Sequence, residues 1–489
     1  MSVTTEVFVT VEGGEQVLSR RPRTRRPIRA SYDAAQTTNE NTVHWSNADY
    51  LSADAGATAA IRRVIRSRAR YEVANNTFAR GLVQRVANDV IGTGPRLQLL
   101  TPDASANRSI ERAFSRWAQK IGLAEKLRTM RMAQTTDGEA FAVLVSNPAL
   151  DNSVQLDLRL IEADQVTTPE PSLDPTASAV DGIVFDDQGN PIEYHILRTH
   201  PGDGDAPLVP DYDRVPADSV IHLFRTDRPG QQRGIPEITS ALPLFAMLRD
   251  YSLATLDAAK AAAYFAGILY TDSPANGEAD AVEPLDEIEL DRNLLLTMPG
   301  GWKMSQLRSE HPSATYGEFK REILNEIARC LNMPFNVAAA NSSGYNYASG
   351  RLDHQTYFKA IRVDQAHLEC CVLNRILAAW LDEASLVPGL LPDGLGPYAD
   401  WSSQFFFDGH EHVDPAKEAR AQAIRLDSHT TTLADEYARR GQDWETQLQQ
   451  RAAELHRMRD LGLMADDPTP KGNTYDVTDD HTTPQPAAA

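Results

Sequence analysis

The sequence predicts an α+β protein in which a largely antiparallel sheet is followed by long helices. Short apolar runs typical of strands are concentrated between residues 91 and 225, and one of them turns back at the hairpin signal Gln188-Gly189-Asn190-Pro191. Apolar residues at the 3.6-residue period of a helix dominate the region after residue 236. With 489 residues, 42% of them hydrophobic and 24% charged, the chain has the composition of a soluble globular protein of two to four domains.

The charge balance limits the partners that we expect. A net charge of −20 argues against a protein whose whole surface grips nucleic acid, because such affinity comes from neutralising phosphates. The same charge is compatible with a protein whose acidic surface repels phosphates and so lets a DNA duplex slide past it. The three cysteines have no CxxC spacing, which suggests a reducing site of synthesis without a disulfide framework. We expect no transmembrane helix and no secretory signal.

Residues 1–58 are predicted to form a basic arm. Its segment "SRRPRTRRPIR", from Ser19 to Arg29, contains six arginines and two prolines and cannot be the interior of a helix. Two interpretations remain open: a solvated tail, or an extended arm that binds anions or a neighbouring subunit.

Residues 59–235 are predicted to form the α+β domain. Its helical pattern runs from Ala59 to Val90, with five arginines between Arg62 and Arg70 and an interruption at Asn75-Asn76, and glycines then stop the helix. The GTGP sequence at this stop lacks the ending of a phosphate-binding loop. Strand patterns follow at residues 140–146, 154–161, 182–197 and 219–224.

Two long helices, at residues 236–270 and 313–332, are predicted on either side of an insert at 271–312. The insert begins with "TDSPANGEADAVEPLDEIELD", which has eight acidic residues and no basic one. A soft polar loop follows at residues 333–350, and a long helix at 351–384. Residues 385–463 contain further helices, and the polar, proline-bearing tail at 464–489 is predicted to be disordered.

The sequence contains no clear catalytic motif. Neither a GxSxG elbow, nor SxxK, nor a Walker sequence is present, and we predict neither an enzyme nor a cofactor. The best metal-like group lacks HExxH spacing and structural-zinc cysteines, and we interpret it as a loop that leads into a helix. It consists of Asp408, His410, Glu411, His412 and Asp414. A metal-dependent nuclease or protease that uses this group is the alternative function.

Seven stretches, in the same order over some 400 residues, resemble the lambda-type family of portal (head-tail connector) proteins of tailed bacteriophages. They are "SYDAA" (31–35), "NNTFARGLVQRVANDVIGTGPRLQ" (75–98), "DGEAFAVL" (137–144), "LIEADQV" (160–166), "VPADSVIHLFRTDRPGQQRGIPEI" (215–238), "NYASGRLD" (346–353) and "VDPAKEARA" (413–421). No single stretch is decisive, but their collinear order is specific.

The resemblance implies a portal fold and a ring, dodecameric in the virion, at one capsid vertex. Residues 59–235 would be the α/β wing, the two long helices the stem, residues 271–312 a small α/β clip, and 385–463 helices of the wing and crown. The implied partners are the terminase large subunit, the major capsid and scaffolding proteins, a neck or head-completion protein, and double-stranded DNA in transit. Assembly would take place in the host cytoplasm, without a membrane. Another ring protein of the neck is the remaining alternative.

The resemblance also assigns site residues. The loop at 333–350 would be the tunnel loop, whose neutral hydrogen-bonding and aromatic groups can touch phosphates weakly and repeatedly. Its residues are Asn341, Ser342, Ser343, Gly344, Tyr345, Asn346 and Tyr347, with Arg351 on the next helix. An ordinary connection between helices, and an intersubunit ion pair for Arg351, are the alternatives. The clip residues that would face the terminase or neck are Asp286, Glu287, Glu289 and Asp291.

A closed ring needs two different complementary patches on each subunit. The arginine-rich helix supplies a positive one, and we predict subunit contacts through Arg62, Arg63, Arg66 and Arg68.

Overall fold

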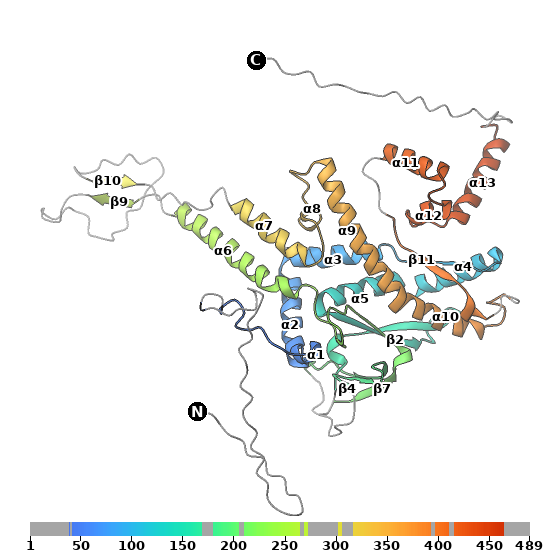
Figure 1. The fold of residues 1–489 in the computed structure, drawn as a ribbon, viewed down its shortest axis with the longest axis horizontal. Coiled ribbons are helices and arrows are strands. Elements are labelled where there is room, and N and C mark those ends of the chain that lie inside the picture. The colour runs from blue at the N-terminus through green and yellow to red at the C-terminus, as the bar shows by residue number, and fades with distance from the viewer. Residues whose placement is uncertain are drawn as a thin grey trace, which may run out of the picture. The chain divides into compact units, whose positions relative to one another are not determined.

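The part of the chain that the structure, a computed structural model, describes consists of helices and small antiparallel sheets (Figure 1). It describes residues 39, 42–168, 179–204, 210–264, 268–271, 302–305, 316–392, 397–409 and 415–463. Contacts divide the chain into residues 1–52, of which residue 39 and residues 42–52 are described, and residues 53–489, which contain every helix and strand below. The predicted α+β class is confirmed.

The first helices are α1 (Ala53–Gly56), α2 (Ala59–Asn75) and α3 (Thr77–Ile91). The interruption predicted at Asn75-Asn76 is the boundary between α2 and α3. Asn76 is extended there, and its side-chain oxygen accepts hydrogen bonds from the backbone of Phe78 and Ala79, so it caps α3. Gly92, at a φ of 59°, ends α3 as the glycine pattern predicts.

Two further helices contribute to the main core. They are α4 (Ala104–Lys120), capped by Asp103, and α5 (Leu123–Asp137). Phe114 and Trp117 of α4 meet Trp380, with ring centroids 5.4 and 6.4 Å from it. The indole of Trp117 donates a 2.8 Å hydrogen bond to the carbonyl of Leu156, which satisfies its one polar atom in the core.

All strand pairs in the described residues are antiparallel, as predicted. A three-stranded sheet has the order β3-β2-β8, from Leu156–Ile161, Glu139–Ser146 and Val220–Phe224. A four-stranded sheet contains β4 (Ala179–Val180), β5 (Ile183–Phe185), β6 (Pro191–Leu197) and β7 (Tyr212–Pro216) in chain order. The short strand β1 (Arg96–Leu99) pairs with β11 (Ser403–Phe406), which joins the two halves of the chain.

The two predicted stem helices are α6 (Leu242–Tyr264) and α7 (Tyr316–Arg329), which pack against each other (Figure 1). Tyr251 stacks on Tyr316, with centroids 5.7 Å apart. The first helix begins six residues later than predicted, because the chain before it makes a 3₁₀ turn, η4 (Thr239–Ala241). Between the helices, β9 (Ile268–Thr271) pairs with β10 (Trp302–Ser305).

The remaining helices are α8 (Phe335–Ala338), α9 (Tyr347–Leu368), α10 (Asn374–Ser385), α11 (Pro415–Asp427), α12 (Leu433–Ala438) and α13 (Trp444–Asp460). A single π-helical turn at Glu369–Leu373 joins α9 to α10, so the long predicted helix is continuous but widened at one point. The three cysteines are free. None of the described helices combines the length and apolar character needed to span a membrane.

Candidate functional site

The polar loop predicted at residues 333–350 is shorter in the structure. Residues 335–338 form helix α8, and α9 already begins at Tyr347. The connection between these helices is therefore confined to residues 339–346. This connection follows α7 and α8 and precedes α9, which is the position in the chain that the resemblance gives to the tunnel loop.

Two turns give this connection its shape. The side-chain oxygen of Asn341 accepts a 2.9 Å hydrogen bond from the backbone of Ser343. The backbone of Tyr345 donates a 3.2 Å hydrogen bond to the carbonyl of Ser342. Gly344, between them, has a φ of 85°, which glycine adopts without the penalty that a Cβ brings. The tip is thus a defined turn with neutral groups.

Asn341, Ser342, Ser343 and Gly344 are all exposed. Asn346 ends the connection by accepting a 2.9 Å hydrogen bond from the backbone of Ser349, which makes it the N-cap of α9. Gly350 is already inside the first turn of α9, and Arg351 is exposed on the same helix. The structure describes the backbone of Tyr347 but not its side chain.

The buried face of α9 is attached to the α+β domain by hydrogen bonds to α3. The Tyr357 hydroxyl donates a 2.8 Å hydrogen bond to Asp89 of α3, and the amide of Gln365 donates a 3.0 Å bond to the carbonyl of Val90. Burial and the Asp89 charge raise the pKa of Tyr357, so this hydroxyl stays protonated. The exposed turn is therefore carried by a helix with buried polar attachments.

A buried arginine extends these attachments to the residues that precede α6. Arg131 of α5 makes 2.9 Å ion pairs with both Glu237, five residues before α6, and Asp364 of α9. Burial lowers the pKa of Arg131, but Glu237 and Asp364 outweigh this effect and raise it overall. Arg131 is 4% exposed, and losing either partner would leave a buried charge partly uncompensated. It links α5, the approach to α6, and α9.

Replacement of Tyr357 by phenylalanine tests this attachment. Tyr357→Phe removes only the hydroxyl group, which donates a hydrogen bond to Asp89. Hydrogen bonds to charged groups contribute about 1.5–3 kcal/mol to the free energy of unfolding. We expect the free energy of unfolding to fall by that amount, measured by urea denaturation followed by tryptophan fluorescence. Tyr71→Phe, at a side chain that is 55% exposed, is the matched control. Equal effects of both changes would contradict the assigned hydrogen bond.

A second buried network joins two of the stretches that carry the resemblance. Glu139, from "DGEAFAVL", is 0% exposed and binds Arg233, from "QQRGIPEI", at 2.7 Å. Its carboxylate also pairs with Arg66 of α2 and lies 3.0 Å from His222 of β8. Burial raises the pKa of Glu139, but the charges of Arg233 and Arg66 and the hydrogen bond from His222 hold it well below its usual range.

The same two stretches come together through their backbones. Gly138 has a φ of 90°, and a Cβ there would lie 2.6 Å from the backbone nitrogen of Pro236. A Cβ on Gly234 would lie 2.6 Å from the carbonyl carbon of Gly138. This contact brings the Gly234 N–H to 3.0 Å from Glu139. The sequence analysis did not select Glu139, Arg233 or His222 as site residues. The glycines next to Glu139 and Arg233 were the available signal that the backbone is closely packed at these positions.

The arginines predicted at subunit contacts divide into two groups. Arg62 and Arg66 are 2% and 3% exposed and pair within the chain, Arg62 with Asp181 and Arg66 with Glu139. We therefore correct the prediction for these two, because their charges are already used inside the subunit. Arg63 and Arg68 are exposed on α2, and their place at a subunit contact stays a prediction.

Other predicted site residues lie outside the described part of the chain. These are the clip residues Asp286, Glu287, Glu289 and Asp291. Residues 1–38, 40 and 41 of the arm predicted at 1–58, and the tail at 464–489, also lie outside it.

Of the metal-like group, Asp408 alone is described; His410, Glu411, His412 and Asp414 are not. Asp408 accepts hydrogen bonds from the backbone and hydroxyl of Thr93, at 2.5 and 2.8 Å. Its carboxylate thereby holds the turn after α3, which gives this residue a structural role.

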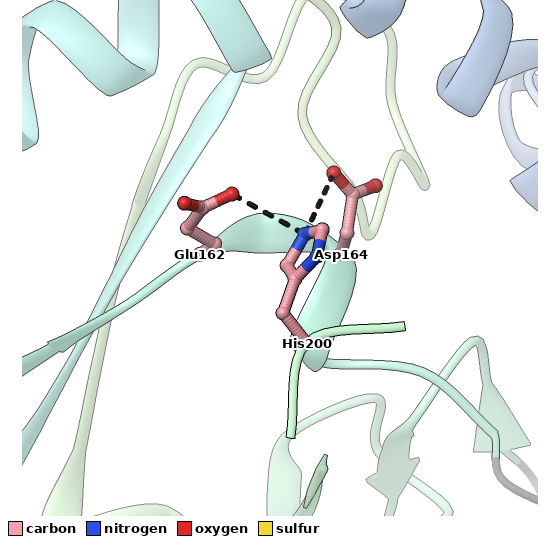
Figure 2. A group of neighbouring side chains, drawn as sticks. All are labelled: Glu162, Asp164 and His200. Atoms are coloured by element: carbon pink, nitrogen blue, oxygen red, sulfur yellow. Dashed lines mark ion pairs between the residues drawn. The ribbon is translucent and has the colours of Figure 1, made fainter. Parts of the chain in front are cut away.

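A different group could in principle hold a metal ion. Glu162, Asp164 and His200 offer ligand atoms that lie within 4.8 Å of one another (Figure 2). His200 Nε2 is 3.3 Å from Glu162 and 3.8 Å from Asp164. However, Arg70 pairs with both carboxylates, at 3.4 and 2.7 Å, and Arg66 lies 3.3 Å from Asp164. Two guanidinium groups already compensate these acids, which favours an ion-pair network over a cation site.

The chain is similar to named portal proteins of phages. A family model described as "Phage portal protein, lambda family" matches residues 40–365. The probable portal protein of Halomonas phage phiHAP-1 is 25% identical over 446 residues, which cover 83% of this chain and 82% of that protein. The portal protein of Escherichia phage N15 is 21% identical over 450 residues, which cover 80% and 83%.

Among solved structures, a chain from the neck of a native gene transfer agent (GTA) particle, computed with C12 symmetry, superposes with a TM-score of 0.44. It is 14% identical and covers 76% of this chain and 91% of that chain. A chain from the virion of a native GTA particle gives 0.41 at 16% identity, and covers 74% and 88%. The family match is the firmer finding, because it includes 326 of the 489 residues. The protein belongs to the lambda family of phage portal proteins.

Proposed function

We propose that this protein forms a ring, of twelve copies in the virion, at one vertex of a phage capsid. The ring is the conduit through which double-stranded DNA enters and leaves the head. The observation that carries this proposal is the family match over residues 40–365, which includes the stem helices, the exposed turn and most of α9. The buried attachments of Arg131, Tyr357 and Glu139 support it, because a conduit under load needs a rigid subunit.

In this proposal the turn at residues 339–346 faces the channel, and its exposed amide and hydroxyl groups contact passing phosphates without strong affinity. The insert between α6 and α7 docks the terminase large subunit during packaging, and a neck protein afterwards. Capsid and scaffolding proteins hold the wing at the vertex. The role is structural, and the force for packaging comes from the docked motor.

Negative-stain electron microscopy and mass photometry of the purified chain test the ring. We expect particles with a central hole and a mass that is a multiple of 53.9 kDa. A stable monomer that persists when capsid and scaffolding proteins are present would overturn the proposal.

Added charge tests the channel-facing turn. Ser342→Lys with Ser343→Lys introduces two cations per subunit, and each new phosphate contact adds affinity through counterion release. We expect rings of unchanged mass but at least about a tenfold loss of nuclease-protected DNA in a packaging reaction, because DNA binds the ring instead of sliding. Ser342→Ala with Ser343→Ala is the control and should package nearly normally. If both pairs package alike, the turn does not face the DNA.

A further inference from the structure

Helix α4 carries a ridge of positive charge that the proposed conduit does not use. Arg108, Arg112, Arg116 and Lys120 follow one another at intervals of four residues. Residues four apart lie on one face of a helix, and each step advances about 6 Å along the axis. The four cations therefore form a row about 18 Å long. We call this row the α4 ridge.

Few acids compensate the α4 ridge within the part of the chain that the structure describes. Arg108 lies 3.9 Å from Glu445, and Lys120 lies 3.8 Å from Asp151, whose side chain is fully exposed. Such long, exposed ion pairs contribute little. Arg112 and Arg116 each donate through Nε to the carbonyl one turn earlier, and no described carboxylate pairs with either.

The one acid on α4 itself, Glu111, binds a backbone group and does not pair with the α4 ridge. Glu111 accepts a 2.7 Å hydrogen bond from the backbone of Leu99 on the neighbouring strand β1. Burial raises its pKa, with smaller contributions from the charges of Asp443 and Glu445. The α4 ridge is therefore a local concentration of positive charge on a chain of net charge −20.

The composition of the exposed face favours a polyanion over a protein. Interfaces between proteins are centred on apolar and aromatic residues, whereas no large apolar side chain is exposed anywhere in the described residues 101–168. The exposed neighbours on α4 include Ser109, Ser115 and Gln119, which can donate hydrogen bonds to phosphate oxygens. Dissolved salt screens the field of acidic residues that are more than about 8–10 Å away. The α4 ridge therefore dominates the electrostatic potential that a ligand meets on contact with it.

We infer that the α4 ridge binds the phosphate backbone of duplex DNA without reading its sequence. Laid along the duplex axis, a row about 18 Å long spans roughly five phosphates of one strand. This contact is separate from the turn at residues 339–346, since α4 packs on β1 and α5, while that turn is carried by α9. The choice of DNA among polyanions rests on the proposed function, which brings a genome to the protein.

Binding of the full-length protein to a fluorescein-labelled, 40-base-pair duplex of random sequence tests the inference. Fluorescence anisotropy is followed between 50 and 200 mM NaCl. Each phosphate contact contributes about 0.9 to the slope of log K against log salt. Arg112→Glu with Arg116→Glu should reduce that slope by about 1.8 and weaken binding at 100 mM NaCl at least about tenfold. Arg112→Lys with Arg116→Lys should keep most of the binding.

The control is Arg457→Glu with Arg459→Glu, which makes the same charge change on the exposed end of α13. Equal weakening by the control would show a general charge effect and overturn the inference, as would the absence of binding by the unaltered protein at 50 mM NaCl. Mass photometry of each sample shows whether the ring has formed, so a loss of DNA binding can be distinguished from a loss of ring assembly. If Arg112→Glu with Arg116→Glu changes the number of subunits but not DNA binding, the α4 ridge contacts a second copy instead.

Discussion

Glu139→Gln is expected to cause the largest loss of stability of any isosteric change in the described chain. It keeps the shape of the side chain but removes the negative charge that Arg66 and Arg233 share. Removing one partner of a buried ion pair typically costs about 3–5 kcal/mol, because it leaves an uncompensated charge. Urea denaturation followed by tryptophan fluorescence should show the midpoint falling accordingly. The matched control, Glu454→Gln on exposed α13, should leave the midpoint nearly unchanged.

The effect of Glu139→Gln should also depend on pH. The pKa of Glu139 is lowered in the folded chain, so the unfolded chain binds its proton at a higher pH. The contribution of Glu139 to stability is therefore fully present above the unfolded pKa of about 4.3 and is lost as pH falls further. The pKa of His222 is lowered as well, in this case by burial and against the pull of Glu139, which adds to acid destabilisation below about pH 6.5.

The stability difference between wild type and Glu139→Gln should therefore be constant near pH 7 and shrink below pH 4.3. Thermal unfolding at a series of pH values measures it. A difference that grows on acidification would contradict the assigned direction of the Glu139 pKa.

Gly138→Ala is expected to have a comparable effect for a steric reason. A Cβ at φ 90° costs about 1–2 kcal/mol, and here it would also overlap the backbone of Ile235 and Pro236. Overpacking against atoms that cannot swing away adds about 1–3 kcal/mol. We expect the free energy of unfolding to fall by about 2–5 kcal/mol, with a lower soluble yield.

Gly189→Ala is the matched control for this change. Gly189 has a φ of 86°, close to that of Gly138, but a Cβ there would have no atom within 4 Å. The control therefore isolates the cost of backbone conformation, and the excess in Gly138→Ala measures the close contact. If the two changes have the same effect in urea denaturation, the contact between the two stretches is looser than the structure shows.

Local patterns predicted the elements well where one rule dominated. The helix boundary at Asn76 and the glycine stop at Gly92 follow from capping and backbone freedom, which depend on adjacent residues. The late start of α6 was missed, since Pro236 and Pro243 both suit a first helical turn. The start of α6 depends on tertiary contacts, because residues 234–236 pack on Gly138.

The arginines of α2 show why site prediction reached less far. Arg62, Arg63, Arg66 and Arg68 are the same residue type within seven positions, yet two are buried and two are exposed. The partners of the buried pair, Asp181 and Glu139, are 119 and 73 residues away in the chain. No spacing rule connects such distant positions. The position of the exposed turn could be predicted, because the order of the elements around it is itself in the sequence.

The strand pair β9-β10 has a consequence for how this protein can change over time. Pairing of Thr271 with Trp302 brings the two ends of the segment 272–301 together at one place. A strand pair of this kind closes the base of any chain inserted between its two strands, and doubling the length of a flexible loop closed in this way costs only about 0.6 kcal/mol of closure entropy. Insertions between β9 and β10 are therefore expected to leave the packing of α6 against α7 intact.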